Sequence, residues 1–181
     1  MIRLVPAYKK GSLFIAIENG TNLQQLSLLV QVLEGSENPE TTNEFEEEEK
    51  LEWSVLCDNE WLSLHPSYVL SNTTDNFLKT GVVTLTIPKE ATKENTKFPE
   101  GYFWIRVDNP KDYDTISQLI DIQAQVATAV FSPEGNSLEH LTYGLPAETI
   151  SKLTERLVTI KGITQPFNSF DGKPEETDRA F

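Results

Sequence analysis

The chain has 181 residues, of which 38% are hydrophobic and 24% charged, and its formal net charge is −13 with an isoelectric point near 4.5. This length and composition are typical of a folded protein with one good core or two small ones. The acidic balance argues against binding to nucleic acid or to an anionic membrane surface, because both need clustered Lys and Arg. No stretch of the sequence approaches the length of a membrane-spanning helix, so membrane insertion is not expected.

The single cysteine, Cys57, excludes an intramolecular disulfide and a thiolate metal site. We interpret Cys57 as a small buried apolar residue rather than a nucleophile, because the two histidines, His65 and His140, are not obvious partners for it. Residues 1–20 lack the pattern of a signal peptide, since the apolar run 13–17 is too short. The sequence therefore predicts synthesis without export through the Sec pathway.

Residues 1–12 are interpreted as a lead-in of uncertain order. The first predicted strand is Leu13–Ile17, which ends at the turn signal Asn19-Gly20. The next is Leu26–Leu33, with mostly buried faces. A helix is the competing interpretation of this second run, but its β-branched content and the following Gly35 favour a strand.

The segment from Glu34 to Lys50 is acidic and includes four consecutive glutamates, Glu46–Glu49. A calcium-binding loop needs oxygen ligands at alternating positions and a glycine for the bend, and this run has neither. Adjacent like charges repel one another and extend the chain. The segment is therefore predicted to be a solvated loop rather than a cation site.

Leu51–Leu64 is predicted to form a β-hairpin with its turn at Asp58-Asn59. Two tryptophans, Trp53 and Trp61, flank this turn. They could form a sugar-binding platform or belong to the core. The core is favoured because cross-strand aromatic pairs commonly stabilise sheets.

The run Gly101–Val107 is the most aromatic and β-branched in the chain, and turn residues bound it on both sides. Such composition is typical of a β-strand. Side chains alternate between the two faces of a strand, and both faces of this run are largely apolar. We therefore expect a central strand that is covered on both sides, around which the rest of the domain is built.

Three further segments complete the predicted domain. Residues 71–76 form a polar loop, and Val82–Ile87 is a strand closed by a proline. Gln118–Phe131 alternates as a half-solvated strand, with Ile120 on its apolar side. About seven strands without a long helix predict an antiparallel β-sandwich-like domain over residues 13–131, so the fold class is mostly β.

Residues 132–181 are predicted to form a small α+β segment. Residues 146–157 fit either a short helix or extended chain, and the pattern leaves this choice open. Val158–Ile163 favours a strand and a turn. Pro174–Asp178 has the signature of a helix start, with proline first and acids after it. We therefore expect a truncated segment that belongs to a longer protein or is completed by a partner.

The block Leu145–Leu153 followed by Lys161–Glu175 resembles the baseplate J-like family, the wedge proteins of contractile phage tails and related injection systems. In that family a Leu-Pro opening with Thr-Ile precedes a Gly-hydrophobic step into Gln-Pro. Ser-Phe-x-Gly-x-Pro-Glu then leads into a long helix. That helix and the downstream domains are absent after Phe181. Three other segments are similar to the family and occur in the same order: Leu26–Gly35, Leu51-Glu52-Trp53 and Gly101–Arg106. The resemblance therefore covers roughly residues 13–181.

The resemblance implies a structural component of the baseplate wedge that joins hub and sheath and has no enzymatic activity. Its implied partners are other baseplate, hub and sheath proteins in a multi-copy assembly. The implied location is the cytoplasm during assembly and then a phage tail-like particle. No catalytic, cofactor-binding or metal-ligating residue is predicted, and no cofactor is expected.

Two alternatives come from other functional classes. The first is a carbohydrate-binding or adhesin-type β-sandwich module, in which Trp53, Trp61, Trp104 and Tyr68 would form a stacking platform. Burial of the tryptophans would exclude it. The second is a glycosidase with two carboxylates. Among 28 acidic residues some pair always has a suitable spacing, so the sequence gives this alternative little support.

Overall fold

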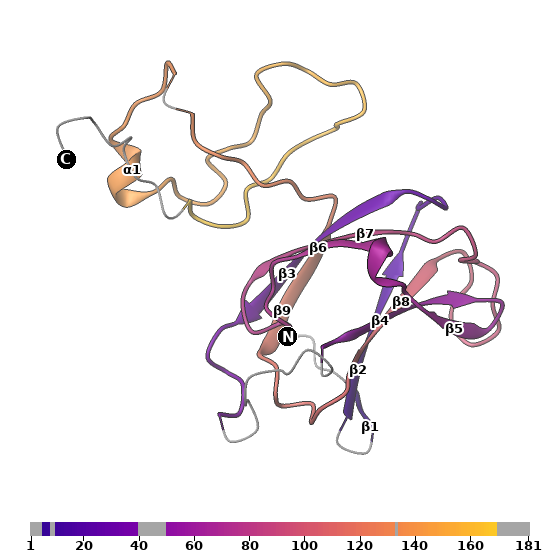
Figure 1. Cartoon of the computed structure of the whole chain (residues 1–181). Coiled ribbons are helices and arrows are strands. Elements are labelled where there is room, and N and C mark those ends of the chain that lie inside the picture. The colour runs from indigo at the N-terminus through magenta and orange to yellow at the C-terminus, as the bar shows by residue number, and fades with distance from the viewer. Residues whose placement is uncertain (1–4, 8–9, 40–49, 133, 170–181) are drawn as a thin grey trace. The chain divides into compact units, whose positions relative to one another are not determined.

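The computed structural model describes residues 5–7, 10–39, 50–132 and 134–169. The chain divides into two compact units, residues 1–127, here called the β unit, and residues 128–181, here called the C-terminal unit. The described residues of the β unit form nine strands (Figure 1). In the C-terminal unit the one regular element among the described residues is the short helix α1 (His140–Tyr143).

The strands of the β unit form two antiparallel sheets. Their bounds are β1 (Val5–Ala7), β2 (Lys10–Ile17), β3 (Gln25–Leu33), β4 (Glu52–Cys57), β5 (Glu60–Ser63), β6 (Val69–Asn72), β7 (Gly81–Thr86), β8 (Phe103–Asn109) and β9 (Gln118–Ala124). The five-stranded sheet has the order β1-β2-β8-β4-β5 and the four-stranded sheet the order β6-β7-β3-β9. The predicted mostly-β, sandwich-like class is confirmed.

The core lies between the inner faces of the two sheets, where residues of β2, β3, β4, β7, β8 and β9 are buried in a single apolar cluster. In β8 the buried residues are Phe103, Ile105 and Val107, and Ile105 is paired with Ile15 of β2 and Val55 of β4. The four-stranded sheet contributes its own alternating set: Leu26, Leu28, Val30, Val32, Val83, Leu85 and Leu119. Burial of this continuous apolar surface is the main stabilising term of the unit.

β8 is the central strand of its sheet, as predicted for the run Gly101–Val107. Its two faces differ, however. The inner face is fully buried, whereas Trp104 and Arg106 on the outer face are only half-buried. The hairpin prediction is also confirmed, because β4 and β5 are joined at Asp58-Asn59, both of which have positive φ angles, as a tight type I′ turn requires.

The predicted alternation of β9 is wrong at Ile120, although Ile122 packs against the core as predicted. The register of β9 shifts opposite Gln31 and Val32 of β3, and this β-bulge leaves Ile120 without a partner. Leu119 is consequently buried at 2% exposure while Ile120 is 40% exposed, the reverse of the expected facing. The strand also ends at Ala124 rather than continuing to residue 131.

Two strands were not predicted. β1 pairs with the beginning of β2, so residues 5–7 and 10–12 of the segment interpreted as a lead-in belong to the five-stranded sheet. β6 pairs with β7 and begins before the predicted polar loop. Both are short strands at the ends of their sheets, and neither has the strong alternation that makes a strand recognisable in sequence.

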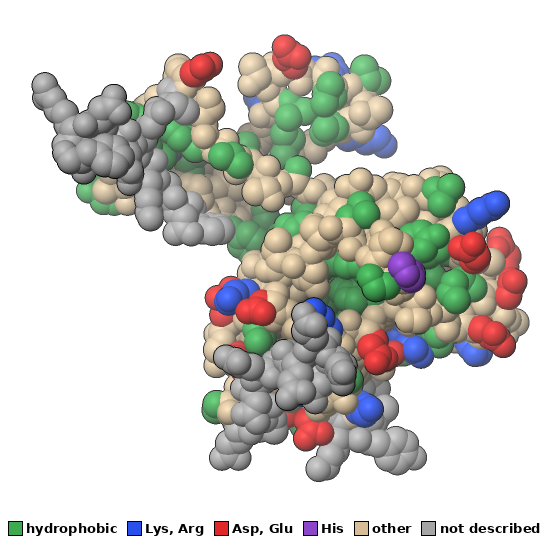
Figure 2. Space-filling model, viewed as in Figure 1, with side chains coloured by type: hydrophobic (Ala, Val, Ile, Leu, Met, Phe, Trp, Pro, Cys, Tyr) green, Lys and Arg blue, Asp and Glu red, His purple; other side chains and the backbone are tan. Residues whose placement is uncertain are grey.

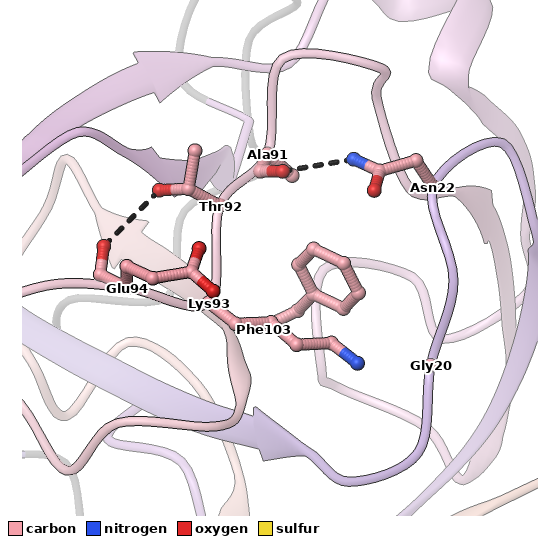
Figure 3. Close-up of a pocket in the computed structure, with 7 residues that line it drawn as sticks. All are labelled: Gly20, Asn22, Ala91, Thr92, Lys93, Glu94 and Phe103. Carbon is pink, nitrogen blue, oxygen red and sulfur yellow. Dashed lines mark hydrogen bonds between the residues drawn. The ribbon is translucent and has the colours of Figure 1, made fainter.

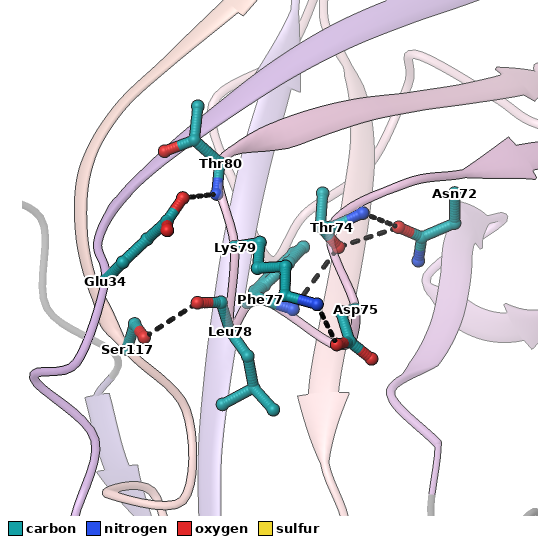
Figure 4. A network of polar contacts seen from close by, with 9 residues as sticks. All are labelled: Glu34, Asn72, Thr74, Asp75, Phe77, Leu78, Lys79, Thr80 and Ser117. Atoms are coloured by element: carbon teal, nitrogen blue, oxygen red, sulfur yellow. Dashed lines mark hydrogen bonds and ion pairs between the residues drawn. The ribbon is translucent and has the colours of Figure 1, made fainter. Parts of the chain in front are cut away.

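The turn between β6 and β7 places Phe77 in the core (Figure 4). The side chain of Asn72 accepts hydrogen bonds from the backbone N–H and hydroxyl of Thr74, and the Thr74 hydroxyl accepts one from the N–H of Phe77. Asp75, Asn76 and Phe77 all have positive φ angles. These polar contacts hold a strained turn so that the Phe77 ring lies edge-on, 6.0 Å from Trp53.

The described residues of the C-terminal unit contain the short helix α1 and no strand. Residues 146–157 contain neither a helix nor a strand, which answers the choice that the sequence left open. The strand predicted at Val158–Ile163 is also absent. The acidic run Glu46–Glu49 and the helix start at Pro174–Asp178 lie outside the described residues. None of the described helices is both long and apolar enough to cross a membrane.

Candidate interaction surfaces

The hollow between the β2–β3 connection and the loop after β7 has a volume of about 280 Å³ and is built from structural contacts (Figure 3). Asn22 donates hydrogen bonds from its side-chain amide to the carbonyls of Pro88, Lys89 and Ala91, at 2.8–3.1 Å. The Lys93 ammonium lies 4.9 Å from the centre of the Phe103 ring. The Asn22 amide therefore binds the loop after β7 to the β2–β3 connection, and Glu94 is the one carboxylate among the residues that line the hollow.

The titratable groups of the described residues form no cluster of three or more that could hold a metal ion. Cys57, at the end of β4, is half-buried and packs against the core, close to its predicted role. Burial, together with the nearby negative charges of Glu90 and Asp58, raises the pKa of the Cys57 thiol. The thiol is therefore protonated at neutral pH, and this lowers its reactivity as a nucleophile.

An aromatic cluster covers the outer face of the five-stranded sheet. Phe98, from the loop before β8, lies between the other rings, with centroids 4.8 Å from Trp104, 5.2 Å from Phe14 and 5.7 Å from Trp61. The guanidinium of Arg106 lies 4.7 Å from the centre of the Trp61 ring. These rings cover one another in part, since Trp61, Phe98 and Trp104 are half-buried, and they form a packed aromatic group on the outside of the sheet.

The residues of the hypothetical sugar platform are therefore divided between the two sides of the sheet. Trp53 is buried in the main core, and Tyr68 packs against that core. Trp61 and Trp104 belong to the outer cluster, but the Phe98 ring between them is tilted by 73° and 31° from their planes. The indole N–H of Trp104 donates to the carbonyl of Pro99 at 3.0 Å. The predicted core position thus holds for Trp53 and not for Trp61.

In the C-terminal unit, residues 145–150 and 165–169 are joined by hydrogen bonds, and we call this pairing the neck. The Ser169 hydroxyl accepts a hydrogen bond from the N–H of Leu145 at 2.6 Å. The side-chain carbonyl of Asn168 accepts one from Ala147 at 2.8 Å. Gln165 accepts two, from Glu148 to its backbone and from Ile150 to its side chain. The neck joins the two halves of the sequence block that carries the family resemblance.

Gly144 shows why the neck needs specific residues. Its φ angle is +72°, a conformation that other residues rarely adopt, and an added Cβ atom would collide with the carbonyl oxygen of Ser169. Polar side chains then satisfy backbone N–H groups that have no partner in a helix or strand. The neck is consequently held by hydrogen bonds and backbone shape rather than by an apolar core.

The neck encloses residues 151–164, here called the 151–164 loop. All but one of its residues are exposed. The exposed apolar side chains of the loop are Leu153, Leu157, Val158 and Ile160, of which Val158 is 96% exposed. The loop has three basic residues and one acidic residue, a net charge of +2, although the whole chain carries −13. Figure 2 shows its hydrophobic side chains at the surface beside Lys and Arg side chains.

Sequence reasoning missed the 151–164 loop as a surface. Its leucines were interpreted as one face of a possible helix, and the run from Val158 to Ile163 as a strand. A signal was present, because apolar residues alternate irregularly with Lys152, Arg156 and Lys161 and fit no single period. A large apolar surface rimmed by charge often marks a site of protein–protein contact.

The comparisons with known proteins agree with a structural role. The family described as baseplate protein PVC11-like matches residues 5–181, almost the whole chain. The curated proteins include no match to this sequence. The expected class, a baseplate protein, is confirmed, whereas the match does not single out the baseplate J-like wedge proteins. The chain belongs to the PVC11-like family of baseplate proteins.

Proposed function

We propose that this protein is a non-enzymatic component of the baseplate wedge of a contractile tail or injection system, where it joins the hub to the sheath. The observation that carries the proposal is the family match over residues 5–181. In this account the chain assembles in the cytoplasm with other baseplate, hub and sheath proteins and is present in several copies in a phage tail-like particle.

The β unit supplies what such a role needs mechanically. Its two sheets share one continuous core, and the aromatic cluster stiffens the outer face of one of them. A body packed in this way has few alternative arrangements, because protein interiors are as dense as organic crystals. It can therefore transmit force between neighbouring proteins and hold a fixed geometry before contraction.

The C-terminal unit supplies the adhesive part. Among its described residues none is buried, and its exposed hydrophobic side chains exceed what a small free unit usually leaves in water. Residues 132–181 are in this proposal the segment that resembles the beginning of a baseplate J-like domain. Neighbouring subunits would cover it, and charge complementarity would select those neighbours.

The proposal is tested in cells that produce the particle. Deletion of the gene should leave hub or tube structures without attached sheath when cell lysates are viewed by electron microscopy, and the wild-type gene should restore full particles. A Lys93→Ala/Glu94→Gln variant, which removes the charged groups of the hollow in the β unit, should also restore them. Normal particles in the deletion strain would overturn the proposal. If the wild-type gene restores particles and the Lys93→Ala/Glu94→Gln variant does not, the hollow has a chemical role.

A carbohydrate-binding module remains the second candidate because Trp61 and Phe14 lie on an outer face. Its test uses the same cells with Trp61→Ala. The structural account expects this change to alter stability modestly without changing attachment of finished particles to glycans. Particles that assemble normally and lose glycan binding would favour the binding module instead.

A further inference from the structure

The 151–164 loop exposes four large apolar side chains, and its charge limits the partners that fit it. Three basic residues against one acidic residue leave a net charge of +2. A partner surface must therefore be apolar at its centre and acidic around it, because like charges at an interface cost several kilocalories per mole.

The β unit itself carries such a surface. Residues 51–72, which include β4, β5 and β6, contain Glu52, Asp58 and Glu60 and have no Lys or Arg. All three acids are exposed. Two large apolar side chains are also exposed there, Leu62 at 44% and Leu70 at 52%. We call β5, β6 and the β4–β5 turn the acidic edge, in which Asp58 and Glu60 lie, whereas Glu52 lies at the start of β4 outside it.

The backbone of the acidic edge can accept another segment. β5 is the last strand of the five-stranded sheet and β6 is the end strand of the four-stranded sheet, so each lacks a described strand on one side. The 151–164 loop has no helix or strand of its own. An irregular segment can add to a free sheet edge through backbone hydrogen bonds, and its side chains then fill positions on alternating sides.

We infer that the 151–164 loop of one copy of this protein binds to the acidic edge of a second copy. Loop and edge are opposite in charge sign, and each exposes apolar side chains. Because the two surfaces are different, the contact is heterologous, and its repetition adds further copies, in a ring where the rotation between copies closes. The inference rests on the proposed function, for which it names one partner surface.

The test measures the association of the purified full chain by sedimentation velocity over a range of concentrations. Wild-type protein should associate as its concentration rises. Val158→Asp in the loop and Leu62→Asp on the edge should each weaken association about tenfold or more, since central apolar contacts dominate interface energies. The matched controls are Val130→Asp and Leu33→Asp, which place the same charge at exposed apolar positions outside the two surfaces and should associate as wild type does.

A charge exchange tests the partner. Arg156→Glu and Glu60→Arg should each weaken self-association, and a mixture of the two single variants should form a heterodimer because the altered loop of one matches the altered edge of the other. Far-ultraviolet circular dichroism and a melting curve establish that each variant is folded.

Three results would overturn the inference. They are a wild-type chain that stays monomeric at all concentrations, association that is insensitive to both surfaces, and a loop–edge contact that forms within one chain independently of concentration. If the loop variants instead prevent particle assembly while the purified chain remains monomeric, another baseplate protein covers the loop. In that case the second-copy inference fails and the proposed function stands.

Discussion

Different forces stabilise the inside of the β unit and the inside of the described part of the C-terminal unit. Twenty apolar residues form the buried core of the β unit, including residues from strands of both sheets. From residue 128 to 169 no described residue is buried, and the neck depends on hydrogen bonds to Gln165, Asn168 and Ser169. One region therefore folds on its own, and the other has little apolar burial to offset the entropy of ordering its chain.

This difference supports our proposal that the β unit acts as a rigid body and the C-terminal unit as a binding segment. The net contribution of one hydrogen bond to stability is smaller than that of a buried large side chain, because water competes for the same donors and acceptors. The C-terminal unit should accordingly open locally at low cost when it is free. Binding to a partner would bury its exposed side chains and stabilise it by mass action.

The largest expected effect is in the core of the β unit. Phe77→Ala should lower the free energy of unfolding by about 3–5 kcal/mol, because it removes a fully buried ring that contacts Trp53. Urea unfolding followed by tryptophan fluorescence measures this loss. Tyr143→Ala, at an exposed position in the C-terminal unit, is the control and should change stability by less than about 0.5 kcal/mol. Equal losses for the two variants would remove the distinction between the units.

A smaller effect is expected on the outer face of the same sheet. Trp104→Ala should cost about 1–3 kcal/mol, less than a core tryptophan, because its ring is half-buried and packs chiefly on Phe98 and Tyr102. Phe98→Ala removes the same ring contact, so its loss of stability overlaps with that of Trp104→Ala. The double variant should therefore lose less stability than the two single losses added together. Strict additivity would show that the aromatic cluster does not behave as one packed group.

The neck should respond locally. Asn168→Ala removes the acceptor for the N–H of Ala147, a loss of about 0.5–1.5 kcal/mol. Hydrogen exchange should become faster for the amides of residues 145–150 and stay unchanged in the β-unit strands. The control is Asn136→Ala, which removes a hydrogen bond to Ser132 outside the neck and should leave the neck amides unchanged. Faster exchange throughout the chain would contradict the independence of the two units.

The smallest effect concerns pH. A hydrogen bond from the Ser117 hydroxyl, at 2.7 Å, is the main cause that lowers the pKa of the Glu37 carboxyl. The folded state therefore binds this proton less tightly than the unfolded chain. The resulting stabilisation is present above the ordinary carboxyl pKa of about 4.3 and is lost as the pH falls through the lowered folded pKa. In Glu37→Gln, melting temperatures measured from pH 7 to pH 3 should fall less steeply than in the wild type.

The sequence was sufficient to predict the well-patterned strands and the hairpin turn. Gly101–Val107 has a composition that only a sheet interior explains, and Asp58-Asn59 is a strong turn signal. It was insufficient where structure depends on a partner strand. The bulge at Ile120 arises from pairing with β3, and the short strands β1 and β6 exist because long neighbours accept them.

The surfaces could be predicted only in part. Whether Trp53 and Trp61 share a side depends on the turn between them, and two tryptophans near one turn look alike in sequence. The apolar residues of the 151–164 loop resemble a helix face in composition. Their exposure follows from the neck, which joins residues more than fifteen positions apart through side chains of Asn168 and Ser169. Such non-local contacts leave no periodic signal.

The most direct measurement is hydrogen–deuterium exchange of the full chain, free and within the assembled particle. The account predicts slow exchange in the β-unit strands in both states, with fast exchange of residues 151–164 in the free chain and marked protection of the same residues in the particle. Equal exchange of the 151–164 loop in the two states would contradict it, as would protection in the free chain that matches that of β8.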